Sequence, residues 1–79
     1  MANKRSDEEI IWAKQFGDRL KRLIHISGKT QRQVADELGI NEAIISKYIT
    51  GTYTPKAYRI EELANALNCD VNRLYDKDF

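Results

Sequence analysis

Cysteine, histidine and proline are scarce, each occurring once among the 79 residues. Cys69 therefore has no partner for a disulfide within the chain. Cys69 and His25 alone are too few to hold a metal ion, which needs three or four protein ligands. The sequence contains no glycine-rich phosphate loop, and no nucleophile lies beside a base at helical spacing. We expect no metal, no cofactor and no catalytic residues, and therefore a protein that is not an enzyme.

Long apolar runs are missing as well. A membrane-spanning helix needs about 18 continuous apolar residues, and no stretch approaches that length. No short apolar run is followed by a cleavage site. Hydrophobic residues make up 42% and charged residues 32% of the sequence, which is too apolar for a disordered chain. We expect a single domain that stays in the cytoplasm without a membrane anchor.

The spacing of the apolar residues predicts an all-α fold. They recur three and four positions apart, whereas the alternation typical of strands is missing. Gly28, Gly39 and Gly51 are expected to end three of the helices, because glycine readily adopts the left-handed conformation that follows a helix. The sequence therefore predicts five short helices joined by turns of a few residues.

Capping residues predict where the helices begin. Ser6 and Glu9 fit the capping box, in which the side chain of each binds the backbone N–H of the other. Gly17 weakens this first helix by about 1 kcal/mol relative to alanine. The helix is therefore expected to begin either after Ser6 or near Phe16, following a looser turn. The other expected caps are Thr30 with Gln33, Asn41, Thr54 before Pro55, and Asp70.

Charge is balanced overall but unevenly distributed. The 13 basic and 12 acidic residues give a net charge of +1. Residues 14–59 hold nine basic and four acidic residues, net +5, whereas residues 1–13 carry net −1 and residues 60–79 net −3. A basic middle between acidic flanks can form a local positive face on a nearly neutral protein.

Residues 31–50, QRQVADELGINEAIISKYIT, carry the most informative pattern. Two short helices are expected to meet around Gly39, since a tight turn between steeply crossing helices needs a residue that adopts positive φ. Ala35 is small enough to leave room for Ile45 at that crossing. The residues expected to face inward are Val34, Leu38, Ile40, Ile45 and Tyr48.

This segment resembles the helix-turn-helix of the phage repressor and Cro family, also called XRE-type regulators. The likeness extends from Phe16 to Leu74, about three quarters of the chain. It implies a compact five-helix, lambda-repressor-like DNA-binding domain whose third helix enters the major groove, usually as a dimer on a palindromic operator. On this basis we assign 14–76 to the helix-turn-helix domain, 1–13 to an N-terminal extension or the start of the first helix, and 77–79 to a C-terminal tail.

The third helix is expected to present a small, polar outer face. At about 100° per residue, one face holds Ala43, Ser46, Lys47 and Thr50, and the opposite face holds Ile45, Tyr48 and Ile49. The resemblance implies that the base-reading residues are Glu42, Ala43, Ile44 and Lys47. Lysine can donate to guanine, glutamate can accept from cytosine, and apolar groups can contact the thymine methyl. The expected phosphate contacts are Gln31, Arg32, Ser46, Thr52, Tyr53 and Lys56.

These observations predict a sequence-specific transcriptional regulator, specifically a bacterial or prophage repressor that binds double-stranded DNA as a homodimer. The expected dimerisation residues are Val71, Leu74, Tyr75 and Phe79. A second hypothesis is a protein-interaction module or an antitoxin that uses the same fold to hold a protein partner. The apolar Ile44 and acidic Glu42 favour this alternative, whereas Lys47 and Gln31 oppose it. A protein antagonist is a further possible partner.

Overall fold

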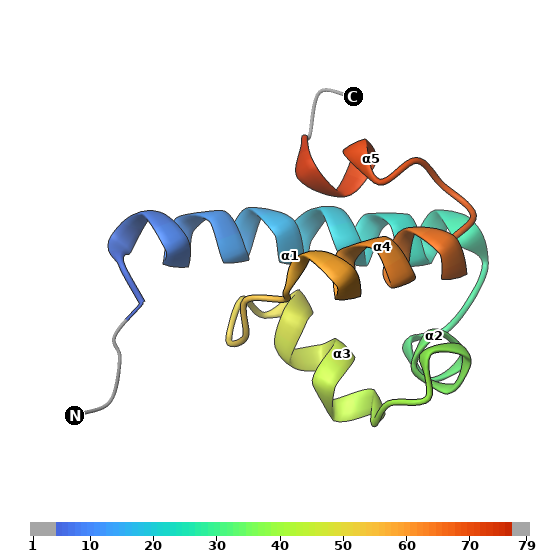
Figure 1. Cartoon of the computed structure of the whole chain (residues 1–79). Helices are drawn as coiled ribbons and strands as arrows, with labels where there is room; N and C mark the ends of the chain where they lie inside the picture. Colours follow the sequence, from blue (N-terminus) through green and yellow to red (C-terminus); the bar gives the residue numbers. More distant parts are fainter. Residues whose placement is uncertain (1–4, 77–79) are drawn as a thin grey trace.

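The computed structural model describes residues 5–76, which form five α-helices and no strand (Figure 1). The predicted all-α, five-helix fold is therefore confirmed for this part of the chain. The helices are α1 (Asp7–Ser27), α2 (Gln31–Leu38), α3 (Glu42–Ile49), α4 (Ala57–Ala66) and α5 (Asn72–Tyr75). None of the helices within residues 5–76 is long and apolar enough to cross a membrane.

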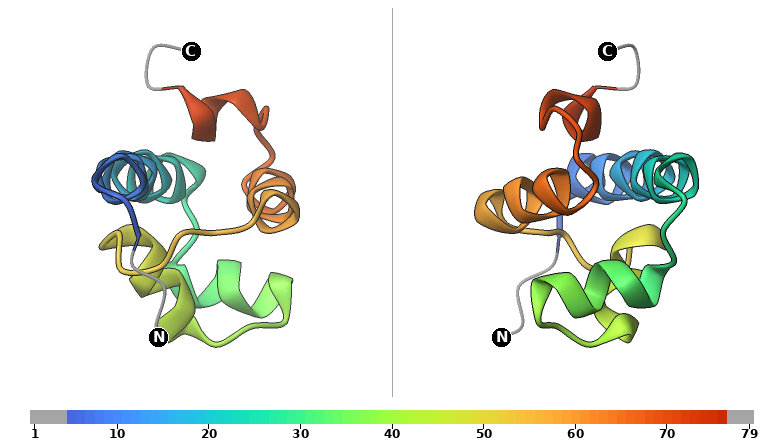
Figure 2. Two further views of the ribbon diagram at one scale, coloured as in Figure 1. Left: turned by 60° about the vertical axis from the view of Figure 1, so that its left-hand side comes forward. Right: turned by 90° about the vertical axis from the view of Figure 1, so that its right-hand side faces the viewer.

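The long helix α1 organises the bundle. Helices α3 and α5 both pack against α1 and lie on opposite sides of it (Figure 1, Figure 2). Helix α2 packs against α3 and α4. Every helix contributes to the shared core, whose largest fully buried side chains are Phe16, Leu20, Val34, Ile45, Leu63 and Leu74. The core thus joins all five elements and fixes the position of α3.

Helix α1 begins at the predicted cap and runs without interruption. The Ser6 hydroxyl accepts a hydrogen bond from the backbone N–H of Glu9 at 3.0 Å. The prediction of a complete capping box is wrong, because the Glu9 carboxylate instead accepts from the hydroxyl of Thr54 at 2.7 Å. The alternative start near Phe16 is also wrong, since Asp7–Ser27 is one continuous helix.

The helices on either side of the central turn are capped as predicted. Thr30 and Gln33 form both hydrogen bonds of a capping box, 3.1 and 2.7 Å long. Asn41 accepts from the backbone N–H of Ala43 at 2.8 Å. Gly39 follows α2 with φ of 72°. Because these contacts join residues two or three positions apart, the sequence was sufficient to predict them.

The two later caps differ from prediction. Thr54 does not cap α4, which begins only at Ala57 with Lys56 as its N-cap and no capping side chain. The Thr54 hydroxyl instead donates to Glu9 of α1 and accepts from Arg5, which precedes the N-cap of α1. The N-cap of α5 is Val71 rather than the predicted Asp70, although the Asp70 carboxylate, one residue earlier, accepts from the backbone N–H of Asn72 at 2.8 Å.

Candidate nucleic-acid interface

Helices α2 and α3 are joined by a tight turn at Gly39. The backbone N–H groups of Gly39 and Ile40 donate to the carbonyls of Asp36 and Ala35, at 3.1 and 3.0 Å, and close the end of α2. At the crossing, the inward residues Val34, Ala35 and Ile45 are all buried. Leu38 and Ile40 are only half-buried at the edge of the core. The α2–turn–α3 unit is therefore held as one body.

Helix α3 has the two faces that its sequence predicts. On its outer face Ala43, Ser46 and Lys47 are exposed, followed by Thr50 at the C-cap. Ile45 and Tyr48 are buried on the opposite side, and Ile49 is half-buried. The outer face is thus free of large apolar groups and can approach another molecule closely.

The two borders of this face differ. Glu42 is exposed in the first turn of α3. Ile44 is half-buried and packs against the hydrophobic core. Only part of the Ile44 side chain is therefore available to a base. The exposed apolar area that Ile44 could offer to a protein partner is reduced for the same reason.

A side-chain hydrogen bond joins the middle of α3 to the start of α2. The Ser46 hydroxyl donates to the side-chain oxygen of Gln31 at 3.0 Å. Gln31 is the first residue of α2, where free backbone N–H groups attract an anion. Two residues predicted to contact phosphate are therefore neighbours on one surface.

The loop after α3 folds back onto Lys47. The Lys47 carbonyl accepts from the backbone N–H groups of Thr52 and Tyr53, at 2.9 and 3.2 Å. The Lys47 ammonium lies 3.1 Å from the Tyr53 hydroxyl oxygen and 4.8 Å from the centre of its ring. Tyr53 in turn meets Tyr48 edge to face, with centroids 6.5 Å apart. Three residues predicted to contact DNA thus form one cluster at the end of α3.

Arg32 and Lys56 stand apart from this cluster in the chain. Arg32 is exposed in the first turn of α2, and Lys56 is exposed at the N-cap of α4. Within residues 5–76, neither side chain makes a hydrogen bond or an ion pair. Both charges therefore remain available to an external anion.

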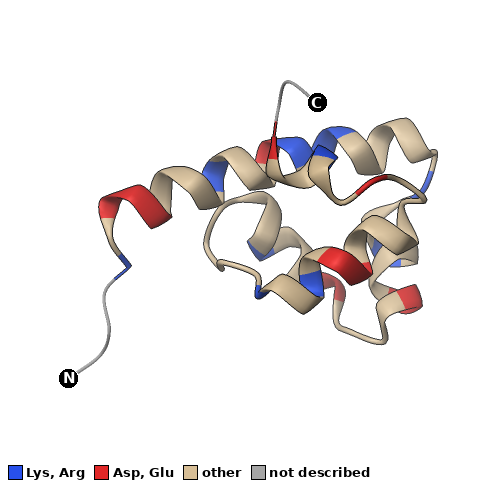
Figure 3. Cartoon of the chain, turned by 45° about the horizontal axis from the view of Figure 1, so that its top comes forward, with Lys and Arg blue, Asp and Glu red and all other residues tan. Residues whose placement is uncertain are grey.

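The basic middle of the sequence is not one continuous positive face. Lys and Arg residues are spread over several helices, and the start of α1 is acidic (Figure 3). Arg19 donates to the carbonyl of Leu74 at 2.6 Å, and Lys29 donates to the carbonyl of Ala66 at 2.5 Å. Lys29 also pairs with Glu37 at 2.8 Å. Several basic groups are thus used in internal contacts.

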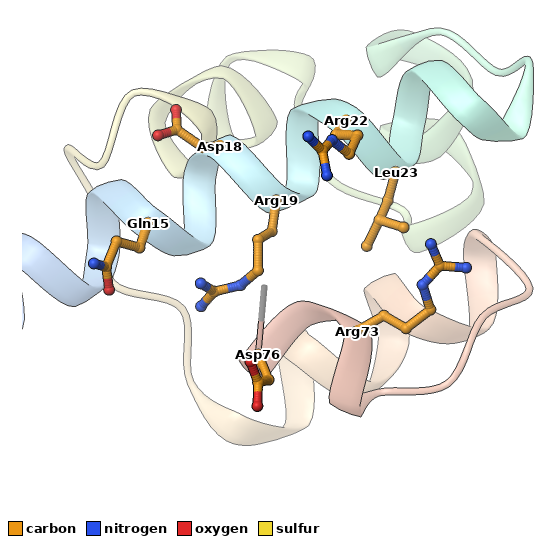
Figure 4. A pocket seen from close by; sticks show the side chains of 7 residues that line it. All are labelled: Gln15, Asp18, Arg19, Arg22, Leu23, Arg73 and Asp76. Carbon is orange, nitrogen blue, oxygen red and sulfur yellow. The ribbon is translucent and has the colours of Figure 1, made fainter. Parts of the chain in front are cut away.

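A cleft of about 350 Å³ opens between part of α1 and α5 (Figure 4). Arg19 and Arg22 line it from α1, and Arg73 from α5. Burial lowers the pKa of the Arg19 guanidinium, while the carboxylates of Asp76 and then Asp18 act in the opposite direction. Because α5 and α3 lie on opposite sides of α1, this cleft is remote from the outer face of α3.

The predicted dimerisation residues lie in different environments. Leu74 is fully buried in the core and cannot contribute to a surface, so its assignment is corrected. Val71 is half-buried against the same core. Tyr75 is 42% exposed and contacts the Trp12 ring, with centroids 6.3 Å apart. Phe79 lies outside the described residues.

One further contact was not foreseen. Arg5 and Glu9 are hydrogen-bonded to the loop between α3 and α4, across separations of 45 to 49 residues. No periodicity or cap relates residues so far apart in the sequence. Only their position on the folded chain could have indicated this contact.

A short helix with an exposed polar face, held by a glycine turn against a second short helix, defines a helix-turn-helix protein. The chain belongs to the helix-turn-helix family, whose sequence model matches residues 20–74. It is of the Cro/C1, or XRE, type and is a DNA-binding transcriptional regulator.

A solved relative has the same fold. The structure is similar to the crystal structure of the restriction-modification controller protein C.AhdI from Aeromonas hydrophila, with a TM-score of 0.76 and 25% sequence identity. The similarity covers 80% of this chain and 96% of that one. None of the curated proteins matches the sequence.

Proposed function

We propose that this regulator binds a palindromic operator as a homodimer and represses transcription by occupying promoter DNA. In this proposal each α3 enters a major groove, and two such helices address half-sites about 34 Å apart. The likeness to a restriction-modification controller protein supports a regulatory role.

One observation carries the proposal: the exposed face of α3 and the residues around it form one polar, hydrogen-bonded surface. The Ser46 side chain on that face is hydrogen-bonded to Gln31 at the start of α2, and the Lys47 side chain is hydrogen-bonded to Tyr53 in the following loop. A major-groove reader needs base-contacting groups on its helix and phosphate-contacting groups flanking them. The arrangement of these polar side chains on and beside α3 supports that role.

Within this surface we assign base reading to Lys47, Glu42 and Ala43, with Ile44 contributing the part of its side chain that is exposed. Lys47 donates to guanine O6 or N7, Glu42 accepts from cytosine N4, and Ala43 contacts a thymine methyl. The proposed phosphate contacts are Gln31, Arg32, Ser46, Thr52, Tyr53 and Lys56.

The dimer surface is proposed to lie around α5. Tyr75 and the half-buried Val71 and Trp12 offer apolar area there. This surface lies on the opposite side of α1 from α3. Two copies could therefore associate without covering the face proposed to read DNA.

The decisive experiment is selection of bound duplexes from a random DNA library at moderate salt, followed by sequencing. An enriched two-fold motif with half-sites one helical turn apart would establish a dimeric operator reader. An enriched single half-site would overturn the dimer. No enrichment with folded protein would overturn sequence-specific binding, and capture of a protein partner would then be tested.

A further inference from the structure

The segment that begins α1 is hydrogen-bonded to the loop that follows α3. The guanidinium of Arg5 donates to the carbonyl of Gly51 at 2.8 Å and to the hydroxyl of Thr54 at 3.2 Å. The Thr54 hydroxyl donates in turn to the carboxylate of Glu9 at 2.7 Å. Arg5, Glu9 and Thr54 are all half-buried. We call this set of three residues the brace.

Backbone packing reinforces the brace. Gly51 is buried and has φ of 78°. A Cβ built on Gly51 would lie 2.8 Å from Cγ and 3.1 Å from Cα of Lys14. The loop therefore lies directly on α1, and both its conformation and this proximity require glycine.

The brace holds both ends of a short functional segment. Gly51 and Thr54 flank Thr52 and Tyr53, which are proposed to contact phosphate. The backbone N–H groups of Thr52 and Tyr53 are bonded to the Lys47 carbonyl at the end of α3. Contacts from α1 at both ends thus limit how far this segment can move relative to α3.

We propose that Arg5 and Glu9 are positioning residues that act through Thr54 to preorganise Thr52 and Tyr53 for binding the DNA backbone. The inference rests on the proposed DNA-contacting role of this loop. Both positioning residues precede residue 20, where the family match begins. A loop that is already ordered loses less conformational entropy on binding, so the brace raises affinity without contacting DNA.

A positioning role and a direct phosphate contact differ in salt dependence. Each phosphate neutralised by a cation contributes about 0.9 to the slope of log K against log salt concentration. One guanidinium nitrogen of Arg5 makes both of its hydrogen bonds to the loop. Removal of Arg5 should therefore weaken binding and leave this slope unchanged.

Matched variants separate the hydrogen bonds from the charges. Glu9→Ala and Glu9→Gln both remove the carboxylate charge, but only Gln keeps an acceptor for Thr54. Thr54→Val removes the hydroxyl, whereas Thr54→Ser keeps it. Arg22→Ala is the control for Arg5→Ala, because Arg22 is exposed, lines the α5 cleft and makes no side-chain hydrogen bond within residues 5–76.

We expect Glu9→Ala and Thr54→Val to bind the selected duplex about 3- to 10-fold more weakly than Glu9→Gln and Thr54→Ser, the usual effect of one lost hydrogen bond. Arg5→Ala should bind more weakly than Arg22→Ala. The double variant of Arg5→Ala and Thr54→Val should lose less binding free energy than the sum of the two single-variant losses, because both substitutions break the same hydrogen-bond network. The proposal would be overturned if Glu9→Ala bound DNA as tightly as Glu9→Gln, and Thr54→Val as tightly as Thr54→Ser. A slope lowered by about one in Arg5→Ala would reassign Arg5 as a phosphate contact.

A second measurement does not depend on DNA. Amide hydrogen exchange in the free protein should be faster at Thr52 and Tyr53 in Glu9→Ala and Thr54→Val than in their matched partners, with folding checked by circular dichroism. Unchanged exchange would refute the brace even if the wild-type protein selects an operator. If the wild-type protein selects no DNA, the proposed function fails, and exchange alone then shows whether the brace orders the loop.

Discussion

Gly17 in α1 lies directly against the last carbonyl groups of α3. A Cβ at position 17 would overlap the carbonyl oxygens of both Ile49 and Tyr48. The two helices therefore meet backbone to backbone at this crossing, which only glycine permits. A residue that weakens α1 as an isolated helix is the one that lets α3 pack against it.

Gly17→Ala is therefore expected to lower the free energy of unfolding by about 1–3 kcal/mol, the usual cost of overpacking a core. In an isolated helix the same change would be favourable by about 1 kcal/mol, so the sign of the effect is informative. Gln15→Ala, at an exposed position of the same helix, should change stability by less than about 0.5 kcal/mol. Urea unfolding measures both variants. A more stable Gly17→Ala would mean that α1 and α3 do not require this contact.

Lys47→Ala and Lys56→Ala are expected to affect DNA binding differently. Lys47 is proposed to read a base, so its loss should cost about 1–3 kcal/mol and relax specificity at one base pair. Lys56 is proposed to contact phosphate, so its loss should weaken binding to all sequences alike and lower the salt slope by about one. Titrations of operator and mismatched duplexes at several salt concentrations measure both effects. If neither variant alters affinity, the assigned docking face is wrong.

Leu74→Ala and Tyr75→Ala test the division between core and dimer surface. Leu74 is fully buried, so its truncation should destabilise the fold by about 2–5 kcal/mol. Tyr75 is 42% exposed, and its truncation should weaken self-association more than it weakens folding. Sedimentation equilibrium and urea unfolding on the same samples separate the two quantities. Unchanged self-association in Tyr75→Ala would exclude this residue from the interface.

Cys69 is expected to make stability depend on pH in the alkaline range. Burial raises the pKa of the Cys69 thiol, while Arg73 acts in the opposite direction and Asp70 adds to the rise. Below the ordinary thiol pKa, Cys69 is protonated in both the folded and the unfolded protein, so this group does not affect the free energy of unfolding. As the pH rises further, the unfolded chain loses this proton first and stability falls.

Comparison with Cys69→Ala isolates this contribution from that of other titrating groups. The variant should lose less stability than the wild-type protein between neutral and alkaline pH. Alkylation of Cys69 by iodoacetamide should also be slower in the folded protein than in urea, because the thiolate is the reactive form. Equal pH profiles for the two proteins would show that the thiol titrates normally in the fold.

The sequence by itself determined the features that depend on near neighbours along the chain. The Thr30–Gln33 capping box, the Asn41 cap and the turn at Gly39 are local, so residue type and spacing were sufficient. The exposed and buried faces of α3 follow in the same way from helical geometry. These features fixed the helix-turn-helix and with it the class of protein.

The tertiary structure alone decided the contacts between distant residues. Glu9 faces Thr54 rather than its own helix cap, and Gly17 sits where two backbones meet. Leu74 completes the core instead of standing on a surface. The physical reason is that each of these positions depends on how whole helices pack, and a side chain takes the partner that packing brings within reach rather than the partner nearest in sequence.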